Sequence, residues 1–284
     1  MYTRRALLSA CITLLACHGP RQATVVPAPS QPEGAGTAAD SQPLPVDAAI
    51  DANPALPGFD ETGSDREAIE IADGVMERLG GRRNWDNTRY ITWRFFGRRL
   101  LVWDKWTGNI RFESKGQVVL MNINSQEGRA WDEGVEVADP DTLSDRLRSG
   151  YRAWIKDTYW LVMPYKLKDS GVTLRYKERG MTEDGIPADV LELTFAAVGI
   201  TPQNKYDVYV DVHERLVRQW AFYRDAADEE PAFVDPWKNW KQYGRIWLAD
   251  GHGRNSHSDV AVFDDLPAVV FESPEVVDMM SLTR

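Results

Sequence analysis

Cysteine is almost absent from this chain of 284 residues. It has two cysteines, Cys11 and Cys17, and both lie close to the N-terminus. The rest of the chain therefore can form no disulfide and offers no thiol nucleophile, so a folded domain there must be stabilised by its hydrophobic core.

Sequence motifs of the common enzyme classes are absent as well. There is no G-x-S-x-G elbow of a serine hydrolase, no phosphate-binding loop and no dinucleotide fingerprint. Paired carboxylates occur, but their positions at a helix start and in a loop explain them without glycosidase chemistry. These pairs are Asp139 with Asp141 and Asp264 with Asp265. We predict that the protein is not an enzyme and needs no cofactor.

Positive charge is in deficit. The chain has 33 Lys and Arg against 43 Asp and Glu, a formal net charge of −10. Binding of a nucleic-acid backbone requires clustered positive charge, so this balance excludes nucleic acid as the expected partner. Solubility beside a membrane is the simpler explanation of the acidity.

The N-terminus resembles an export signal. Arg4 and Arg5 precede an apolar stretch, residues 6–16, that is too short to span a bilayer. The stretch ends in Leu-Leu-Ala-Cys at Cys17, which resembles the bacterial lipobox, so residues 1–17 are predicted to be a lipoprotein signal peptide with lipidation at Cys17. An ordinary secretory signal is the alternative. His18 follows the cysteine where an aspartate would indicate retention at the inner membrane, which favours a periplasm-facing, lipid-anchored protein of the outer membrane.

Composition divides the remainder into two parts. Residues 18–57 are rich in Pro, Ala, Ser and Gly and nearly free of aromatic residues, which predicts a disordered tether. A flexible coil of that length reaches roughly 35 Å. Residues 58–284 are predicted to form a single domain, which we expect to be monomeric.

A run from Tyr90 to Asn124 reads as four successive strands. The breaks at Gly97, Gly108 and Gly116 carry the residue that tolerates tight hairpins, and the strands are rich in Trp, Phe, Val and Ile. About ten strands are predicted in all, with one helix that starts near Ser64 and a second that runs from the entry signal Asp139-Pro140-Asp141 to near Thr158. The predicted fold class is mainly β (α+β), a strongly curved antiparallel sheet forming an open, incomplete barrel with helices covering or plugging its concave face. The apolar tail from Pro267 is expected to fray.

Aromatic residues suggest a binding pocket. Trp160 to Leu167 forms an apolar segment that we expect to be irregular because Pro164 cannot continue a helix, and it would lie over the sheet as a lid. A curled aromatic sheet with such a lid could hold an acyl chain, and a solid core is the equally open alternative. The ligand-pocket candidates are Trp93, Phe95, Trp103, Trp106, Phe112, Leu161 and Met163.

A histidine pair is the remaining chemical feature. His252 and His257, with Asp250 and Asp259, form the pattern D-x-H-x4-H-x-D. Imidazole and carboxylate groups bind zinc, but the intervening glycines indicate a solvated turn equally well. We expect no metal; should one bind, His252 and His257 are the candidates.

Four segments carry a resemblance to a known family. They are GVMERLGGRRNW from Gly74, WDKWTGNIRFE from Trp103, DTYWLVMPYKL from Asp157 and YDVYVDVHERLVRQWAFYR from Tyr206. Over residues 66–272 the chain resembles uncharacterised bacterial exported lipoproteins of the LolA/LolB-like, outer-membrane lipoprotein-sorting fold. The resemblance implies an open curved sheet that holds acyl chains of lipoproteins, and no functional residue is transferred from the carriers.

Together these features predict a lipid-anchored envelope protein that binds a hydrophobic ligand, such as an acyl chain, a lipid or a lipoprotein, without catalysis. The alternative is a protein-interaction or sensing module of the cell envelope with a solid β core. A deep apolar pocket would favour the first, and a filled core with a charged rim would favour the second.

Overall fold

The computed structural model describes residues 53–196, 199 and 201–283. The predicted signal peptide, its Cys17 and tether residues 18–52 lie outside the described residues. Residues 53–57, which the sequence analysis placed in the tether, are bonded to the domain. The side-chain amide of Asn53 donates to a carboxylate oxygen of Asp73 at 2.8 Å, and the N–H of Leu56 donates to the carbonyl of Lys168 at 3.0 Å.

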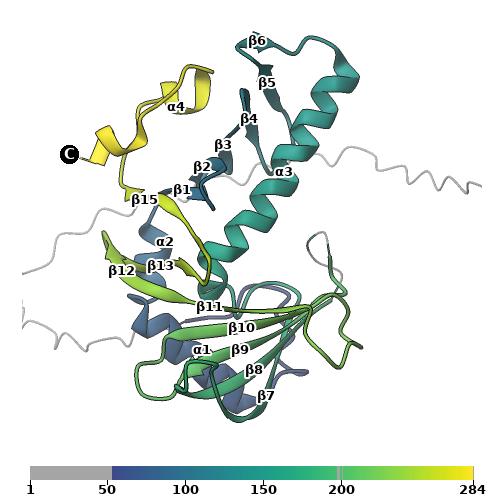
Figure 1. The fold of residues 1–284 in the computed structure, drawn as a ribbon, viewed down its shortest axis with the longest axis vertical. Helices are drawn as coiled ribbons and strands as arrows, with labels where there is room; N and C mark the ends of the chain where they lie inside the picture. Colours follow the sequence, from purple (N-terminus) through teal and green to yellow (C-terminus); the bar gives the residue numbers. More distant parts are fainter. Residues whose placement is uncertain (1–52, 197–198, 200, 284) are drawn as a thin grey trace, which may run out of the picture. The chain divides into compact units, whose positions relative to one another are not determined.

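The predicted meander forms the centre of a seven-stranded antiparallel sheet (Figure 1). Two of its hairpins turn through positive-φ residue pairs, Phe96-Gly97 and Lys115-Gly116, where glycine accepts the conformation at little cost. In spatial order the strands are β15 (Ser258–Phe263), β1 (Tyr90–Phe95), β2 (Arg99–Asp104), β3 (Asn109–Ser114), β4 (Gln117–Asn122), β5 (Gly128–Asp132) and β6 (Val135–Glu136).

The other strands form two smaller antiparallel sheets. The five-stranded sheet has the order β11 (Phe233–Pro236), β10 (Val217–Tyr223), β9 (Lys205–Asp211), β8 (Pro187–Phe195) and β7 (Val172–Met181). The three-stranded sheet consists of β12 (Lys238–Tyr243), β13 (Ile246–His252) and β14 (Asn255–Ser256).

Helices cover the strands on the core side. The first, α1 (Arg66–Arg78), contacts β7, and the short α2 (Arg82–Asn87) precedes β1. The prediction that Ser64 caps the N-terminus of α1 is wrong by one position, because the N-cap residue is Asp65. The Ser64 hydroxyl instead donates to the carbonyl of Asp60 at 2.6 Å and accepts from the N–H of Leu174 at 2.9 Å, which ties the helix start to β7.

The long helix α3 (Pro140–Val162) lies against β4, β5 and β13 (Figure 1). Asp139 caps its start by accepting from the N–H of Thr142 at 2.9 Å, and proline fits the first helical position. The predicted end near Thr158 and the irregular segment after it are corrected: the helix continues to Val162, and a 3-10 turn, η1 (Met163–Tyr165), follows. Buried apolar contacts of Leu161 to Met163 extend the helix to the position where Pro164 ends it.

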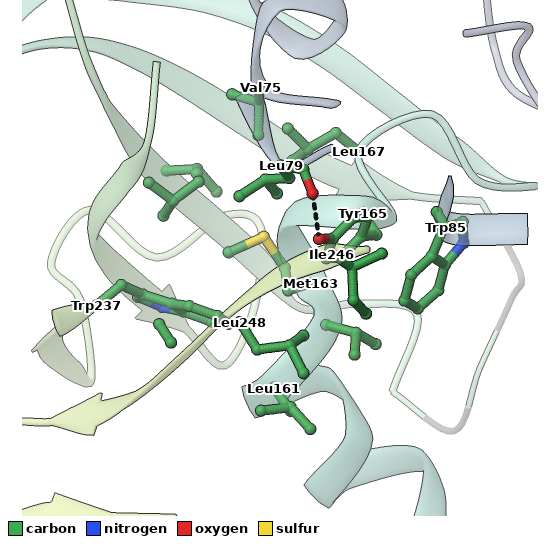
Figure 2. Packing of buried hydrophobic residues seen from close by; sticks show 14 of the residues in the cluster. Val75, Leu79, Trp85, Leu161, Met163, Tyr165, Leu167, Trp237, Ile246 and Leu248 are labelled. Atoms are coloured by element: carbon green, nitrogen blue, oxygen red, sulfur yellow. Dashed lines mark hydrogen bonds between the residues drawn. The ribbon is translucent and has the colours of Figure 1, made fainter. Parts of the chain in front are cut away.

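One hydrophobic core joins all three sheets with α1 and α3. Tyr165 lies at its centre: its hydroxyl is 2.9 Å from the carbonyl oxygen of Leu79 and accepts from the N–H of Trp247 at 3.0 Å (Figure 2). Its ring stacks on Trp85 with centroids 4.2 Å apart, and burial raises the pKa of its hydroxyl. This tyrosine links the end of α1, the end of α3 and β13.

Within the described residues none of the three sheets closes into a barrel, and helices cover the inner side of the strands. The predicted class, a mainly antiparallel β fold forming an open, incomplete barrel with covering helices, is confirmed. Among the described helices, none combines the length and the apolar character that crossing a membrane requires. The expected fraying of the tail is wrong, because a short helix α4 (Val269–Glu272) and a 3-10 helix η2 (Met279–Thr283) contact β3, β4 and β15.

Candidate ligand-binding site

The seven-stranded sheet has two covered faces. One face carries Ile91, Trp93 and Leu101 into the main core beneath α3. The opposite face carries Tyr90, Leu100 and similar residues into a separate cluster with the C-terminal segment, residues 264–283, which we call the tail. Because side chains alternate along a strand, both faces must be apolar for this to occur. The second cluster comprises Tyr90, Leu100, Val102, Ala261, Phe263, Leu266, Val270 and Met279.

A buried arginine fixes the tail to the sheet. Arg111 on β3 is 0% exposed, and its guanidinium donates to the carbonyls of Val270, Ser273 and Glu275 at 3.1, 2.6 and 2.6 Å. Its Nε donates to a carboxylate oxygen of Glu113 at 2.5 Å. A charge this deep is tolerated only when its donors are satisfied, so the tail and Arg111 depend on each other.

A groove opens between the tail and one end of the sheet. Its volume is about 560 Å³, within the range of roughly 300–1,000 Å³ that is usual for small-molecule sites. Tyr90, Leu120, Leu266 and Phe271 form apolar parts of its wall, and the ring of Tyr90 lies 6.0 Å from that of Phe271. The remaining lining residues are Arg89, Asp104, Thr107, Asn109, Ile110, Met121, Asn122, Ser125, Glu127, Gly128, Ala268 and Glu272.

An ion pair stands at the sheet side of this groove. Arg89 donates twice to Asp104, with Nη2 2.9 Å and Nε 3.2 Å from the carboxylate oxygens. Burial by itself would raise the pKa of Asp104, but bonds from Arg89, from Thr107 and from the N–H of Trp106 lower it overall. The carboxylates of Glu127 and Glu272 add negative charge to the lining. The groove therefore has a mixed wall, in which half of the lining residues are polar or charged, and it offers both kinds of contact to an amphiphilic ligand.

The residues predicted to line a pocket lie elsewhere. Four of them are inside the main core and one is exposed, and none lines the groove, so their contact with a ligand stays a prediction. Trp93, Phe112, Leu161 and Met163 are buried, Phe95 and Trp103 are half-buried against the core, and Trp106 is 60% exposed. The segment predicted as a lid is part of the core (Figure 2).

Sequence reasoning missed the groove residues. In the sequence they are indicated only by the apolar run from Leu266 to Phe271 in the tail. Because the tail is predicted to fray, this run does not point to a site. The groove also needs residues from β1 to β5, which are more than 130 positions away in the chain, and no local pattern predicts that pairing.

The two candidate metal-binding histidines are brought together but not with their carboxylates. His252 and His257 are 0% and 4% exposed and their ring centroids are 4.9 Å apart, which corrects the reading as a solvated turn. Burial lowers their pKa values to about 3 and about 4, so both are neutral near pH 7. Asp259 instead pairs with Arg94 at 2.7 Å and Asp250 pairs with Lys241 at 2.9 Å.

Aromatic rings surround this pair. Phe96 stacks on His257 with centroids 5.1 Å apart, while Trp160 and Trp237 meet His252 edge-on at 5.4 and 4.8 Å. Across the described part of the chain, no group of three or more His, Cys, Asp or Glu side chains could hold a metal ion. The histidine cluster thus belongs to the packing between the end of α3 and the three-stranded sheet.

Comparison with known proteins gave matches in structure only. No protein-family model and no curated protein matches the chain. Similar solved structures include a DUF1329 family protein from Desulfovibrio piger (14% identity, 72% of this chain and 97% of that chain, TM-score 0.40). They also include a putative outer membrane lipoprotein-sorting protein domain from Vibrio parahaemolyticus (14%, 77% and 99%, 0.38). A LolA superfamily protein from Nitrosomonas europaea is a third (13%, 70% and 96%, 0.35).

These structural neighbours therefore include the LolA superfamily, the group named by the resemblance in sequence. At such identities and TM-scores, no ligand, partner or activity of this chain follows from the matches.

Proposed function

We propose that this protein binds an amphiphilic ligand with an acyl chain, such as a lipid or the lipidated end of a lipoprotein, in the groove between the tail and the seven-stranded sheet. The groove is the observation that carries the proposal: it has a ligand-sized volume, a wall of mixed apolar and polar residues and a fixed ion pair at one side. Binding would be an equilibrium process driven by burial of apolar area, without bond making or breaking.

The proposal places the protein in the cell envelope, held on the periplasmic side of the outer membrane by a lipid on Cys17. Its support is the lipobox-like sequence that ends at Cys17 and the Pro/Ala-rich stretch that follows it. A tethered domain with such a groove would have its ligand within reach in the same membrane.

Native mass spectrometry of the protein purified from the envelope tests the groove. We expect an adduct with the mass of a phospholipid, fatty acid or acylated peptide, and we expect Phe271→Ala to lose it. Phe222→Ala is the matched control, because Phe222 is another half-buried aromatic residue and lies outside the groove.

Two results would contradict the groove as the binding site. An adduct that both variants retain would place the ligand elsewhere. An adduct lost in Leu161→Ala at unchanged stability would move it to the core side of the sheet, where the sequence analysis had placed the lid.

The second candidate is an envelope interaction module without a ligand. The observation that favours it is the filled core, in which Trp93, Leu161 and Met163 are fully buried where a hollow barrel would need space. A protein that shows only its own mass, before and after incubation with lipid vesicles, would select this candidate.

A further inference from the structure

We propose that the surface around α2, with Trp106 at its centre, rests on an anionic phospholipid bilayer. This surface consists of residues 82–89 and 104–107. The contact is an additional interaction to ligand binding and holds whether or not the groove is occupied. The further step, that a lipid enters the groove from this contact, rests on the proposed function.

Trp106 is an exposed tryptophan held in a fixed orientation. Its side chain is 60% exposed, yet its indole N–H donates to the carbonyl of Asp86 at 2.9 Å and its backbone N–H donates to Asp104 at 3.0 Å. Arg89 lies over the ring, 5.2 Å from its centroid. An indole that is polar on one side and open on the other suits the interface between water and lipid.

The charge around Trp106 differs from that of the whole chain. Residues 82–89 and 104–107 contain four basic side chains and two carboxylates, a local excess of two positive charges in a chain of net charge −10. The basic residues are Arg82, Arg83, Arg89 and Lys105. Arg82 and Arg89 form ion pairs with Asp86 and Asp104, so the attraction to an anionic membrane follows the net excess, at about 1 kcal/mol per net charge.

Lys105 is a mostly buried lysine at the edge of this surface. Its ammonium lies 3.6 Å from the centroid of the Trp85 ring and donates to the carbonyl of Trp85. Burial lowers the pKa of Lys105 to about 7; Asp86 raises it, whereas the charges of Arg82 and Lys166 lower it further. An anionic headgroup nearby would offset that repulsion.

The chain that leads to the N-terminus enters the domain at this surface. Arg82 donates to the carbonyl of Pro54 at 3.2 Å, so residue 54 touches α2. The preceding residues run toward Cys17, the predicted lipid anchor. The residues that connect the domain to the predicted anchor therefore contact α2.

The groove begins at the same place. Arg89, Asp104 and Thr107 belong to the α2 surface and also line the groove. A lipid that leaves the bilayer at Trp106 would therefore meet the apolar wall at Tyr90 without crossing open solvent.

The opposite end of the same sheet provides a matched control. Val135 is 71% exposed, about as open as Trp106. It lies among Asp132, Glu133 and Glu136, and Arg146 and Arg129 pair with the first and the last of these, which leaves a local excess of one negative charge. Its negative surroundings should keep it off an anionic membrane.

The test places a fluorescent probe at each end of the sheet. In the full chain carrying Cys11→Ser and Cys17→Ser, a single cysteine replaces Asn87 or Val135 and is labelled with an environment-sensitive dye. The protein is mixed with phosphatidylcholine vesicles that contain phosphatidylglycerol and nitroxide-labelled lipid. We expect the dye at residue 87 to brighten and to be quenched by the nitroxide, the dye at residue 135 to be unaffected, and Trp106→Ala to weaken vesicle affinity about ten-fold.

Three results would overturn the membrane contact: equal quenching at both positions, a silent probe at residue 87 on vesicle-bound protein, or no vesicle binding at all. Phe271→Ala separates the two proposals, because it should abolish the ligand adduct and leave quenching at residue 87 unchanged. Circular dichroism of each variant confirms that it is folded.

Discussion

The two faces of the seven-stranded sheet are covered in different ways. The face toward α3 is buried by apolar packing from all three sheets, with Trp93 and Leu101 inaccessible. The face toward the tail is covered by a segment of about 20 residues, which one buried charge, Arg111, attaches through backbone carbonyls. The first face is a filled core, and the second leaves a groove.

This difference shows where binding can occur in a fold with an open barrel. A close-packed interior loses stability when any side chain is removed, and a ligand could enter it only by displacing its own core. A face covered by a short segment keeps free volume along the segment's border. We therefore propose that the face toward the tail contributes less to stability than the face toward α3 and is the one that can accept a ligand.

The largest effect should come from the filled face. Replacing Trp93 with alanine removes a fully buried side chain, and we expect a loss of about 3–5 kcal/mol in the free energy of unfolding. Urea denaturation measures it. Trp106→Ala, in the same meander but exposed, should change stability by no more than about 0.5 kcal/mol. Similar losses in both variants would contradict the assignment of the two tryptophans.

A smaller loss should come from the attachment of the tail. Arg111→Ala leaves the carbonyls of Val270, Ser273 and Glu275 and the carboxylate of Glu113 without their donor, at a cost of about 3 kcal/mol. Hydrogen exchange should accelerate in residues 264–283 and much less in β7 to β10. Arg129→Ala is the control, since Arg129 pairs with Glu136 at the surface. Uniform acceleration throughout the chain would refute a local attachment.

Acid should weaken the filled face through its histidines. The pKa values of His252 and His257 fall from 6.5 to about 3 and about 4 on folding, so below pH 6.5 the unfolded state binds more protons than the folded state. This stability is fully present above pH 6.5 and falls with decreasing pH, to about pH 4 for His257 and about pH 3 for His252, by up to about 1.4 kcal/mol per pH unit for each histidine. Unfolding curves in buffers over this range measure the slope.

Substitutions test whether the two histidines cause this loss of stability in acid. His252→Phe keeps an aromatic ring in the cluster and should reduce the slope by about half of the histidine contribution. His213→Asn, at an exposed turn, should leave the slope as it is. An unchanged slope in His252→Phe would assign the acid sensitivity to carboxylates instead.

The smallest stability effect lies in the tail itself. Val270 is 0% exposed and Val269 is 49% exposed, so they form a matched pair of neighbours. Val270→Ala should cost about 1–2 kcal/mol, and Val269→Ala less than about 0.5 kcal/mol. If Val270→Ala also reduces occupancy of the groove while Val269→Ala does not, the packing of the tail sets the shape of the binding site. Thermal unfolding and native mass spectrometry provide the two measurements.

Local patterns predicted the elements that local forces decide. The four strands from Tyr90 to Asn124 were predicted because glycine turns and alternating apolar residues act within a few positions. The end of α3 was not predicted correctly. The sequence pattern indicates an end near Thr158, but the core contacts of Leu161 to Met163 continue the helix to Val162. The position of the binding site was not predicted for a similar reason. Aromatic residues indicate which side chains are buried, but not whether the space around them is filled or open to a ligand.

The sequence by itself determined that the folded part has no disulfide, that its strands form an antiparallel mainly β fold, and that its core is rich in tryptophan. Only the tertiary structure decided which face of those strands stays open. Both faces of β4 are apolar, from Val118 to Met121, so the pattern could not choose between them. The choice follows from long-range contacts, in which the helices and the other two sheets fill one face and the tail, fixed by Arg111, covers the other only in part.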